Sequence, residues 1–229
     1  MIDKKKIPCV AGSSGLVGSY LVKNLSELYP KVISISRREI KFSKHNVYNV
    51  IVDFENLENE NILKEIDHLY IALGTTRKKA GSAKNFEKVD YHYCINLARI
   101  ACDYGVKRIS IVSSVGSNSK SNLLYPRTKG RLEEELAKLS FDHISIMKPG
   151  IILGNRKETR IGEKIAKSIF SIISPLLFGG LTKYKSIHAN DISKAMIHQI
   201  SSGKNGFFQL EFEKIMKYSK KIAFSYSVY

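Results

Sequence analysis

The feature that most constrains the fold of this chain is a glycine-rich segment between a short apolar run and an amphipathic one. The letters GSSGLVG place Gly12, Gly15 and Gly18 at a regular three-residue spacing. Residues 7–12 before them are strand-like, and residues 14–29 carry apolar side chains at helical spacing. A strand that leads through glycines into a helix is typical of a dinucleotide-binding unit, in which a pyrophosphate lies at the helix N-terminus.

The same alternation of strand and helix continues along the chain. Further β-rich runs lie at 31–37, 46–54, 68–74, 108–114 and 143–150. Helix candidates lie at 86–104 and 126–140. Such alternation implies right-handed crossovers and a parallel sheet covered on both faces. We therefore expect an α/β fold with a doubly wound parallel sheet of the Rossmann type that binds NAD(P), with ligands beyond the carboxyl ends of the strands.

Length and composition fit one globular domain. The chain has 229 residues, 43% of them hydrophobic, and we see no linker or internal repeat. We expect a single domain, 1–229, in which 151–229 contributes a small substrate cover. The longest apolar stretch, 165–181, contains Lys167 and Pro175 and is too short to span a membrane. We expect no transmembrane segment, and a weak association of this stretch with a membrane surface is compatible with the sequence.

A net charge of +16 suits a polyanionic partner, but the lysines are scattered and form no aromatic-interleaved basic motif. We therefore interpret the charge as compositional drift and expect no specific nucleic-acid partner. Cys9, Cys94 and Cys102 cannot form a complete disulfide set, so we expect buried free thiols. No Cys/His cluster has zinc spacing, so we expect no metal. With no secretory signal at the N-terminus, we expect a cytoplasmic protein. The sequence contains no signal for a particular oligomeric state.

The glycine loop is the first part of the expected cofactor site. Gly12 permits the tight turn, Gly15 lets the backbone approach a pyrophosphate, and Gly18 allows close packing of helix on strand. We expect the whole loop to line the phosphates, including the residues between the glycines: Ser13, Ser14, Leu16 and Val17.

The end of the second strand indicates which dinucleotide binds. An NAD site usually has an acid there, but this chain has Arg37 and Arg38, which suit the 2′-phosphate of NADP. Asp53, after the third strand, has two open interpretations: an acceptor for the adenine amino group, or a helix N-cap. After the fourth strand, Leu73, Gly74 and Thr75 are expected beside the middle of the cofactor.

The fifth strand and the helix after it supply candidate catalytic groups. Ser113 and Ser114 end the strand, and Tyr125 and Lys129 follow at a spacing that puts both on one helix face. Reduction of a carbonyl needs a proton donor, and a phenol with an ordinary pKa of about 10 serves better beside an ammonium that stabilises its phenolate. We predict that Tyr125 transfers the proton, that Lys129 supplies the charge and holds the ribose, and that Ser114 donates to the substrate oxygen.

At this level of detail the chain resembles the short-chain dehydrogenase/reductase superfamily, in its extended and atypical branch. Within that branch it is most similar to the Tat-interacting-protein-like NADPH-binding oxidoreductases. The segments that carry the resemblance are SRRE, VDFENL, LGTTRKKAG, VDYHYCINLA, SSVGSNSKSNLLYPRTKGRLEEEL and KPGIILGNRKETRIGE. The resemblance implies cofactor roles for Arg37, Arg38, Leu73, Gly74, Tyr125, Lys129, Ile152 and Arg160.

Two positions depart from the family pattern. Pro126 follows Tyr125 directly and disfavours the α region for it, so we expect the pair at the helix entrance rather than within the helix. Lys148 stands where relatives often have arginine.

Two functional interpretations follow. The first is an NADPH-dependent oxidoreductase that acts on a small carbonyl or alcohol. The second is an NADPH sensor with little catalysis, in which the serine, tyrosine and lysine are kept for cofactor geometry.

Overall fold

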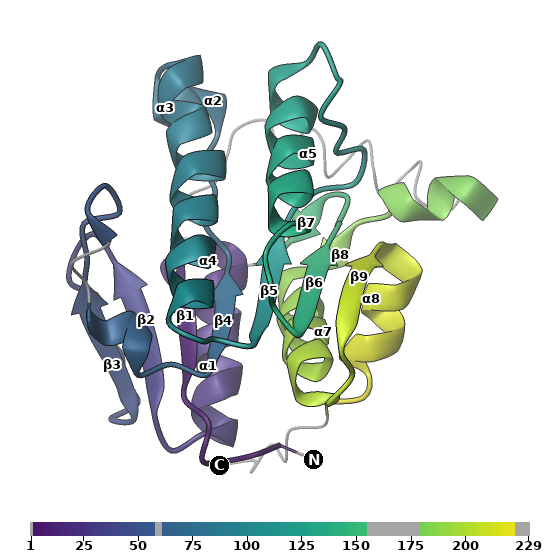
Figure 1. Ribbon diagram of the computed structural model, residues 1–229. Coiled ribbons are helices and arrows are strands. Elements are labelled where there is room, and N and C mark those ends of the chain that lie inside the picture. Colours follow the sequence, from purple (N-terminus) through teal and green to yellow (C-terminus); the bar gives the residue numbers. More distant parts are fainter. Residues whose placement is uncertain (1, 58–60, 155–178, 223–229) are drawn as a thin grey trace.

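The computed structural model describes residues 2–57, 61–154 and 179–222. A seven-stranded sheet, in which every strand pairing is parallel, runs through the centre of this part of the chain (Figure 1). In spatial order its strands are β3 (Val47–Ile51), β2 (Val32–Ser36), β1 (Pro8–Ala11), β4 (His68–Ile71), β5 (Arg108–Val112), β6 (His143–Met147) and β9 (Gly206–Leu210). The expected doubly wound Rossmann sheet is therefore confirmed.

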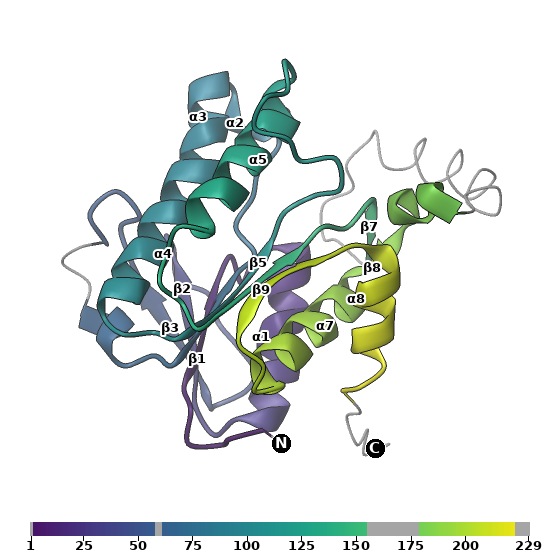
Figure 2. The same cartoon turned by 45° about the vertical axis from the view of Figure 1, so that its right-hand side comes forward.

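Helices cover both faces of the sheet (Figures 1 and 2). One layer contains α3 (Ala83–Glu87), the π-helical turn η3 (Lys88–His92), α4 (Tyr93–Asp103) and α5 (Leu124–Leu136). The other contains α1 (Leu16–Leu28) and α7 (Ala189–Ser201), beside which α8 (Phe212–Ser219) packs. The remaining elements are the short helices η2 (Asn61–Lys64), α2 (Arg77–Ala80) and η5 (Gly179–Tyr184), and a small parallel pair, β7 (Ile152–Leu153) and β8 (Ile187–His188).

Alternate residues of each strand supply the two cores. On β1, Cys9 and Ala11 pack into the cluster under α4 and α5, whereas Val10 packs into the cluster under α1 and α7. Because successive strand side chains point to opposite faces, an apolar run without polar breaks fills both layers. Cys9 and Cys94 are buried free thiols, as expected, and Cys102 is half-buried.

The sheet changes direction of winding between β1 and β4. The chain moves outward from β1 to β2 and β3, then returns to place β4 on the other side of β1. In doubly wound sheets this reversal opens a crevice at the carboxyl ends of the two central strands. The glycine loop and the 72–75 segment follow those two strands, so the fold brings them to the same crevice.

The predicted helix at 86–104 is not one regular helix. It consists of α3, the π-turn η3 and α4 in direct succession. Wider π-turns occur often at functional sites, and this one carries Asp90, which is buried.

The structure corrects the start of the predicted helix at 126–140. Helix α5 begins at Leu124, so Tyr125 lies inside its first turn and Pro126 does not exclude it from the helix. Proline is tolerated there because the first backbone N–H groups of a helix have no intrahelical partner. The Tyr125 and Lys129 pair therefore lies within α5, in its first two turns, and the expectation that Pro126 keeps Tyr125 out of the helix is wrong.

Candidate active site

The glycine loop makes a turn that larger residues would not fit. Gly12 has a φ of +89°, and a Cβ atom there would lie 2.6 Å from the backbone of Ala72. A Cβ atom at Gly18 would lie 2.1 Å from the carbonyl oxygen of Gly12. The two glycines therefore let β1, α1 and the end of β4 approach one another closely, as the sequence predicts for Gly12 and Gly18.

The start of α1 leaves backbone donors available at this turn. Gly15 is the N-cap, and the first intrahelical bond runs from the Ser19 N–H to the Gly15 carbonyl. The N–H groups of Leu16, Val17 and Gly18 therefore precede the hydrogen-bonded ladder and can receive an anion, helped by the helix dipole. This turn fits the pyrophosphate of a dinucleotide. Ser14 is exposed beside it, whereas Ser13 is buried.

The two arginines follow β2 and are both exposed. In the described part of the chain neither guanidinium takes part in a hydrogen bond or an ion pair, so both are available to a phosphate. Asp53 is also exposed and folds back on its own loop, where it accepts from the Glu55 N–H at 2.9 Å and from the Asn56 side chain at 2.6 Å. Asp53 therefore caps the turn that directly follows it, and no helix begins within residues 54–56.

The segment after β4 is joined to the catalytic candidates through Asp90. The Thr75 N–H donates to one oxygen of the Asp90 carboxylate at 2.7 Å. The Lys129 ammonium lies 2.8 Å from the other oxygen, and both charged side chains are almost fully buried. Burial by itself lowers the pKa of Lys129, but the charges of Asp90 and Tyr125 outweigh it and hold that pKa above its ordinary value.

Tyr125 and Ser114 carry the two hydroxyl groups that the sequence predicts to be catalytic. Tyr125 is 46% exposed, and its ring lies against Phe86 with the centroids 5.9 Å apart. Ser114 is only 8% exposed, and its Oγ has no hydrogen-bond partner among the described residues. A buried hydroxyl without a partner is costly in a folded protein unless a ligand or water completes it. The Ser114 hydroxyl therefore has hydrogen-bonding capacity that the described residues leave unused.

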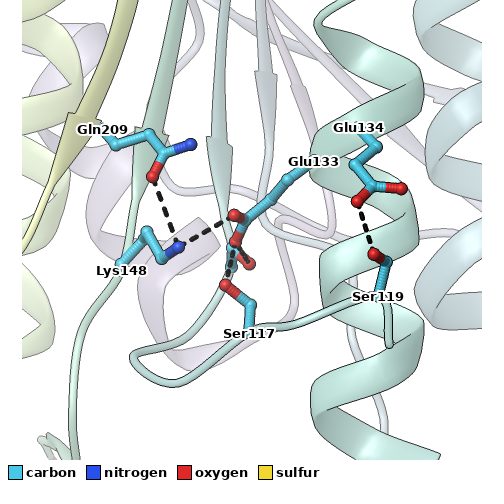
Figure 3. A network of polar contacts seen from close by, with 7 residues as sticks. Ser117, Ser119, Glu133, Glu134, Lys148 and Gln209 are labelled. Carbon is cyan, nitrogen blue, oxygen red and sulfur yellow. Dashed lines mark hydrogen bonds and ion pairs between the residues drawn. The ribbon is translucent and has the colours of Figure 1, made fainter. Parts of the chain in front are cut away.

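A buried polar network holds the loop on which Ser114 lies (Figure 3). The hydroxyls of Ser113 and Ser117, on either side of Ser114, both donate to one oxygen of the Glu133 carboxylate on α5. Its other oxygen lies 2.9 Å from the Lys148 ammonium, which also donates to Gln209 at 3.4 Å. The network ties the serine loop to the helix that carries Tyr125 and Lys129.

Comparison with known proteins decides the family. The profile of the HIM1 family matches residues 19–179. The chain belongs to the HIM1 family. It is 38% identical over 206 residues to Protein FMP52, mitochondrial, of Candida albicans, covering 86% of this chain and 89% of the relative. It is 33% identical over 207 residues to Protein HTATIP2 of Rattus norvegicus, covering 88% and 84%.

The solved structures that resemble this HIM1 family protein share its fold. MoeE5 in complex with UDP-glucose and NAD is 16% identical and superposes with a TM-score of 0.68, covering 93% of this chain and 81% of MoeE5. The sequence resemblance to Tat-interacting-protein-like proteins is confirmed by the rat relative, and the likeness to MoeE5 confirms the Rossmann-type fold.

One expectation is overturned by the relatives. The Candida albicans protein and further fungal relatives carry the word mitochondrial in their names, so the expectation of a cytoplasmic protein is wrong. Within the described residues, no helix has both the length and the apolar character that crossing a membrane requires. Most of the apolar stretch at 165–181 lies outside those residues.

Of the remaining site candidates in this HIM1 family protein, Ile152 lies on β7, paired with Ile187. A Cβ atom at nearby Gly154 would lie 2.7 Å from the Leu16 side chain, which brings this segment to the start of α1. Arg160 lies outside the described residues.

Sequence reasoning missed Asp90 and Glu133 as parts of the site. The signal for Asp90 is a lone acid on the apolar face of its helix, four residues after Phe86 and four before Cys94, both of which are buried. Glu133 has a similar signal, four residues after Lys129 on the same helical face.

Proposed function

We propose that this chain is an NADPH-dependent oxidoreductase that interconverts a small carbonyl compound and the corresponding alcohol. The observation that carries the proposal is the buried ion pair of Lys129 and Asp90, four residues along α5 from Tyr125. The tight glycine turn and the unpartnered hydroxyl of Ser114 support it, because they follow β1 and β5, which both neighbour β4 in the sheet. The family relationship to atypical short-chain dehydrogenase/reductases supports the same class of chemistry.

In the proposed mechanism each side chain has a distinct task. A bound nicotinamide dinucleotide supplies or accepts the hydride. Tyr125 donates the proton to the carbonyl oxygen in reduction, and accepts it in oxidation. The buried Lys129 ammonium favours the phenolate of Tyr125 by its charge. Ser114 donates a hydrogen bond to the same oxygen, which stabilises the negative charge that develops there.

The remaining proposed roles concern binding of the dinucleotide. Arg37 and Arg38 hold the 2′-phosphate, because two free guanidiniums at this strand end suit forked, charge-assisted hydrogen bonds. Asp53 accepts from the adenine amino group through an oxygen of its exposed carboxylate. The backbone of the glycine loop holds the pyrophosphate, and the backbone after β4, from Leu73 to Thr75, lies along the middle of the cofactor. Ile152 contacts the nicotinamide end, and 151–229 contributes the substrate cover.

One observation favours the second candidate, an NADPH sensor with little catalysis. The Lys129 ammonium is already paired with Asp90, so part of its charge is neutralised before it acts on Tyr125. In a sensor, the same pair would serve only to fix the walls of the cofactor site.

The experiment that separates the two candidates is a turnover assay. The purified chain is incubated with NADPH and a panel of aldehydes and ketones, and NADPH consumption is followed by absorbance. The oxidoreductase predicts substrate-dependent consumption for at least one compound. Tight NADPH binding with no turnover across the panel favours the sensor.

The proposed location follows the fungal relatives. Since those proteins are named as mitochondrial, we propose that this chain also acts at mitochondria. Fractionation of the source cells tests this: co-sedimentation with a mitochondrial marker is expected, and recovery only in the soluble supernatant contradicts it.

A further inference from the structure

A side chain on the edge strand β3, Asn49, organises the turn that carries the two arginines. Its amide oxygen accepts from the Ile40 N–H at 2.6 Å. Its amide nitrogen donates to the Ser36 hydroxyl at 2.8 Å and to the Ser34 carbonyl at 3.0 Å. One amide therefore holds both ends of the 36–40 turn, and both of its donor hydrogens are used.

Two further hydrogen bonds extend this arrangement. The Ser36 hydroxyl donates to the Arg38 carbonyl at 2.6 Å. This bond fixes the backbone from Ser36 to Arg38. The Ser34 hydroxyl donates to Ser13 of the glycine loop at 2.7 Å, and both serines are buried. Polar contacts thus run from the glycine loop through Ser34 and Asn49, in the middle of β2 and β3, to the turn at 36–40.

We infer that Asn49 is a specificity-determining positioning residue, which holds Arg37 and Arg38 in place for the 2′-phosphate without touching the cofactor. This inference rests on the NADP preference in the proposed function. Both guanidinium groups are exposed and make no hydrogen bond or ion pair in the described part of the chain, so the backbone of the turn is what limits their freedom. Pre-ordering a turn lowers the entropic cost of binding to it.

The chemistry of the site explains why the residue is an asparagine. Aspartate would keep the acceptor for the Ile40 N–H, but it would lose both donors and place a negative charge near a bound phosphate. Leucine has a similar size and removes all three hydrogen bonds without adding charge. Asn49→Leu is therefore the informative substitution. Tyr48→Ala is the matched control, because Tyr48 lies on the same strand, is 51% exposed and forms none of these bonds.

The test is titration of each protein with NADPH and with NADH, followed by cofactor fluorescence. In Asn49→Leu the ratio of NADH to NADPH dissociation constants should fall by about fivefold or more, the effect expected for loss of one or two net hydrogen bonds. NADH affinity should stay within about twofold. Tyr48→Ala should keep the wild-type ratio. In an Arg37→Ala/Arg38→Ala background, Asn49→Leu should leave the ratio unchanged.

The outcomes separate failure of the inference from failure of the proposed cofactor preference. If the wild type prefers NADPH and Asn49→Leu keeps that preference, or weakens both cofactors equally, Asn49 has only a structural role and the inference is overturned. An equal loss of preference in Tyr48→Ala also overturns it. A wild type without preference overturns both. If Asn49→Leu does not fold, Ser36→Ala removes two bonds of the same turn, and an unchanged ratio in that variant overturns the inference.

Discussion

The ammonium of Lys129 lies 2.8 Å from the carboxylate of Asp90, and both side chains are buried at the junction of three elements. Lys129 lies on α5 and Asp90 on the π-turn η3. The Thr75 N–H, from the segment after β4, donates a hydrogen bond to the second oxygen of the Asp90 carboxylate. The position of the ammonium is therefore fixed by a residue of another helix, and the two helices are locked together where the cofactor is proposed to bind.

We predict that neutralising Asp90 destabilises the protein. Asp90→Asn leaves the buried Lys129 ammonium without a counter-charge, and loss of one partner of a buried pair costs about 3 to 5 kcal/mol of unfolding free energy. The double variant Asp90→Asn/Lys129→Met should recover a large part of this loss, because no unpaired charge remains. Urea unfolding of the wild type, the two single variants and the double variant measures the coupling free energy between the two side chains. Additive effects of the two substitutions would show that the ion pair is energetically unimportant.

The arginines after β2 predict the cofactor preference. NADPH should bind at least about tenfold tighter than NADH, since forked, charge-assisted bonds to the 2′-phosphate are available only with NADPH. Arg37→Ala/Arg38→Ala should remove this difference. The control for net charge is Lys214→Ala/Lys217→Ala, which removes two exposed charges on α8. This variant should keep the difference in affinity between NADPH and NADH. Equal affinities in the wild type contradict the assignment.

Two buried histidines predict acid sensitivity. Burial lowers the pKa of His68 to about 4 and that of His143 to about 4. In the unfolded chain a histidine titrates near 6.5, so between about pH 6.5 and 4 the unfolded state binds protons that the native state does not. The contribution of the two histidines to the free energy of unfolding is therefore fully present above about pH 6.5. It is lost as the pH falls to 4, by up to about 3 kcal/mol for each histidine.

Chemical unfolding across this pH range checks the prediction. His143→Phe, which can still stack on Phe208, should show a shallower loss of stability in acid. His45→Gln, at an exposed position, should behave like the wild type. An unchanged acid slope in His143→Phe rules out its titration as a cause.

The parts of the fold that the sequence predicted are those with a local cause. The glycine turn follows from the spacing of its glycines, and at Gly18 the close approach is to Gly12 and Ser13 of the same loop. Strands such as β2, β5 and β6 are short apolar runs rich in β-branched residues, and Arg37 and Arg38 lie directly after β2. Local composition was therefore enough to place each of these at the carboxyl end of a strand.

The polar partners of the site could not be predicted because their contacts are not local. Asp90 reaches Lys129 across 39 positions of sequence, through a π-turn that helical periodicity does not reveal. Glu133 meets Lys148 only because α5 packs over the end of β6. Asn49 looks like an ordinary residue of an edge strand until the register with Ser34 is known. In the sequence these three residues are visible only as polar side chains at positions where the pattern predicts an apolar one.

The measurement that tests the proposed function most directly compares wild type and Tyr125→Phe on a carbonyl compound that the wild type reduces. Tyr125→Phe keeps the ring and removes the proton, so turnover should fall by about 10² or more, while NADPH affinity stays within about threefold. Ser114→Ala should mainly lower turnover, and Lys129→Met should lower both turnover and NADPH affinity. Full turnover by Tyr125→Phe would contradict the assignment of Tyr125 as the proton donor and, with it, the proposed mechanism.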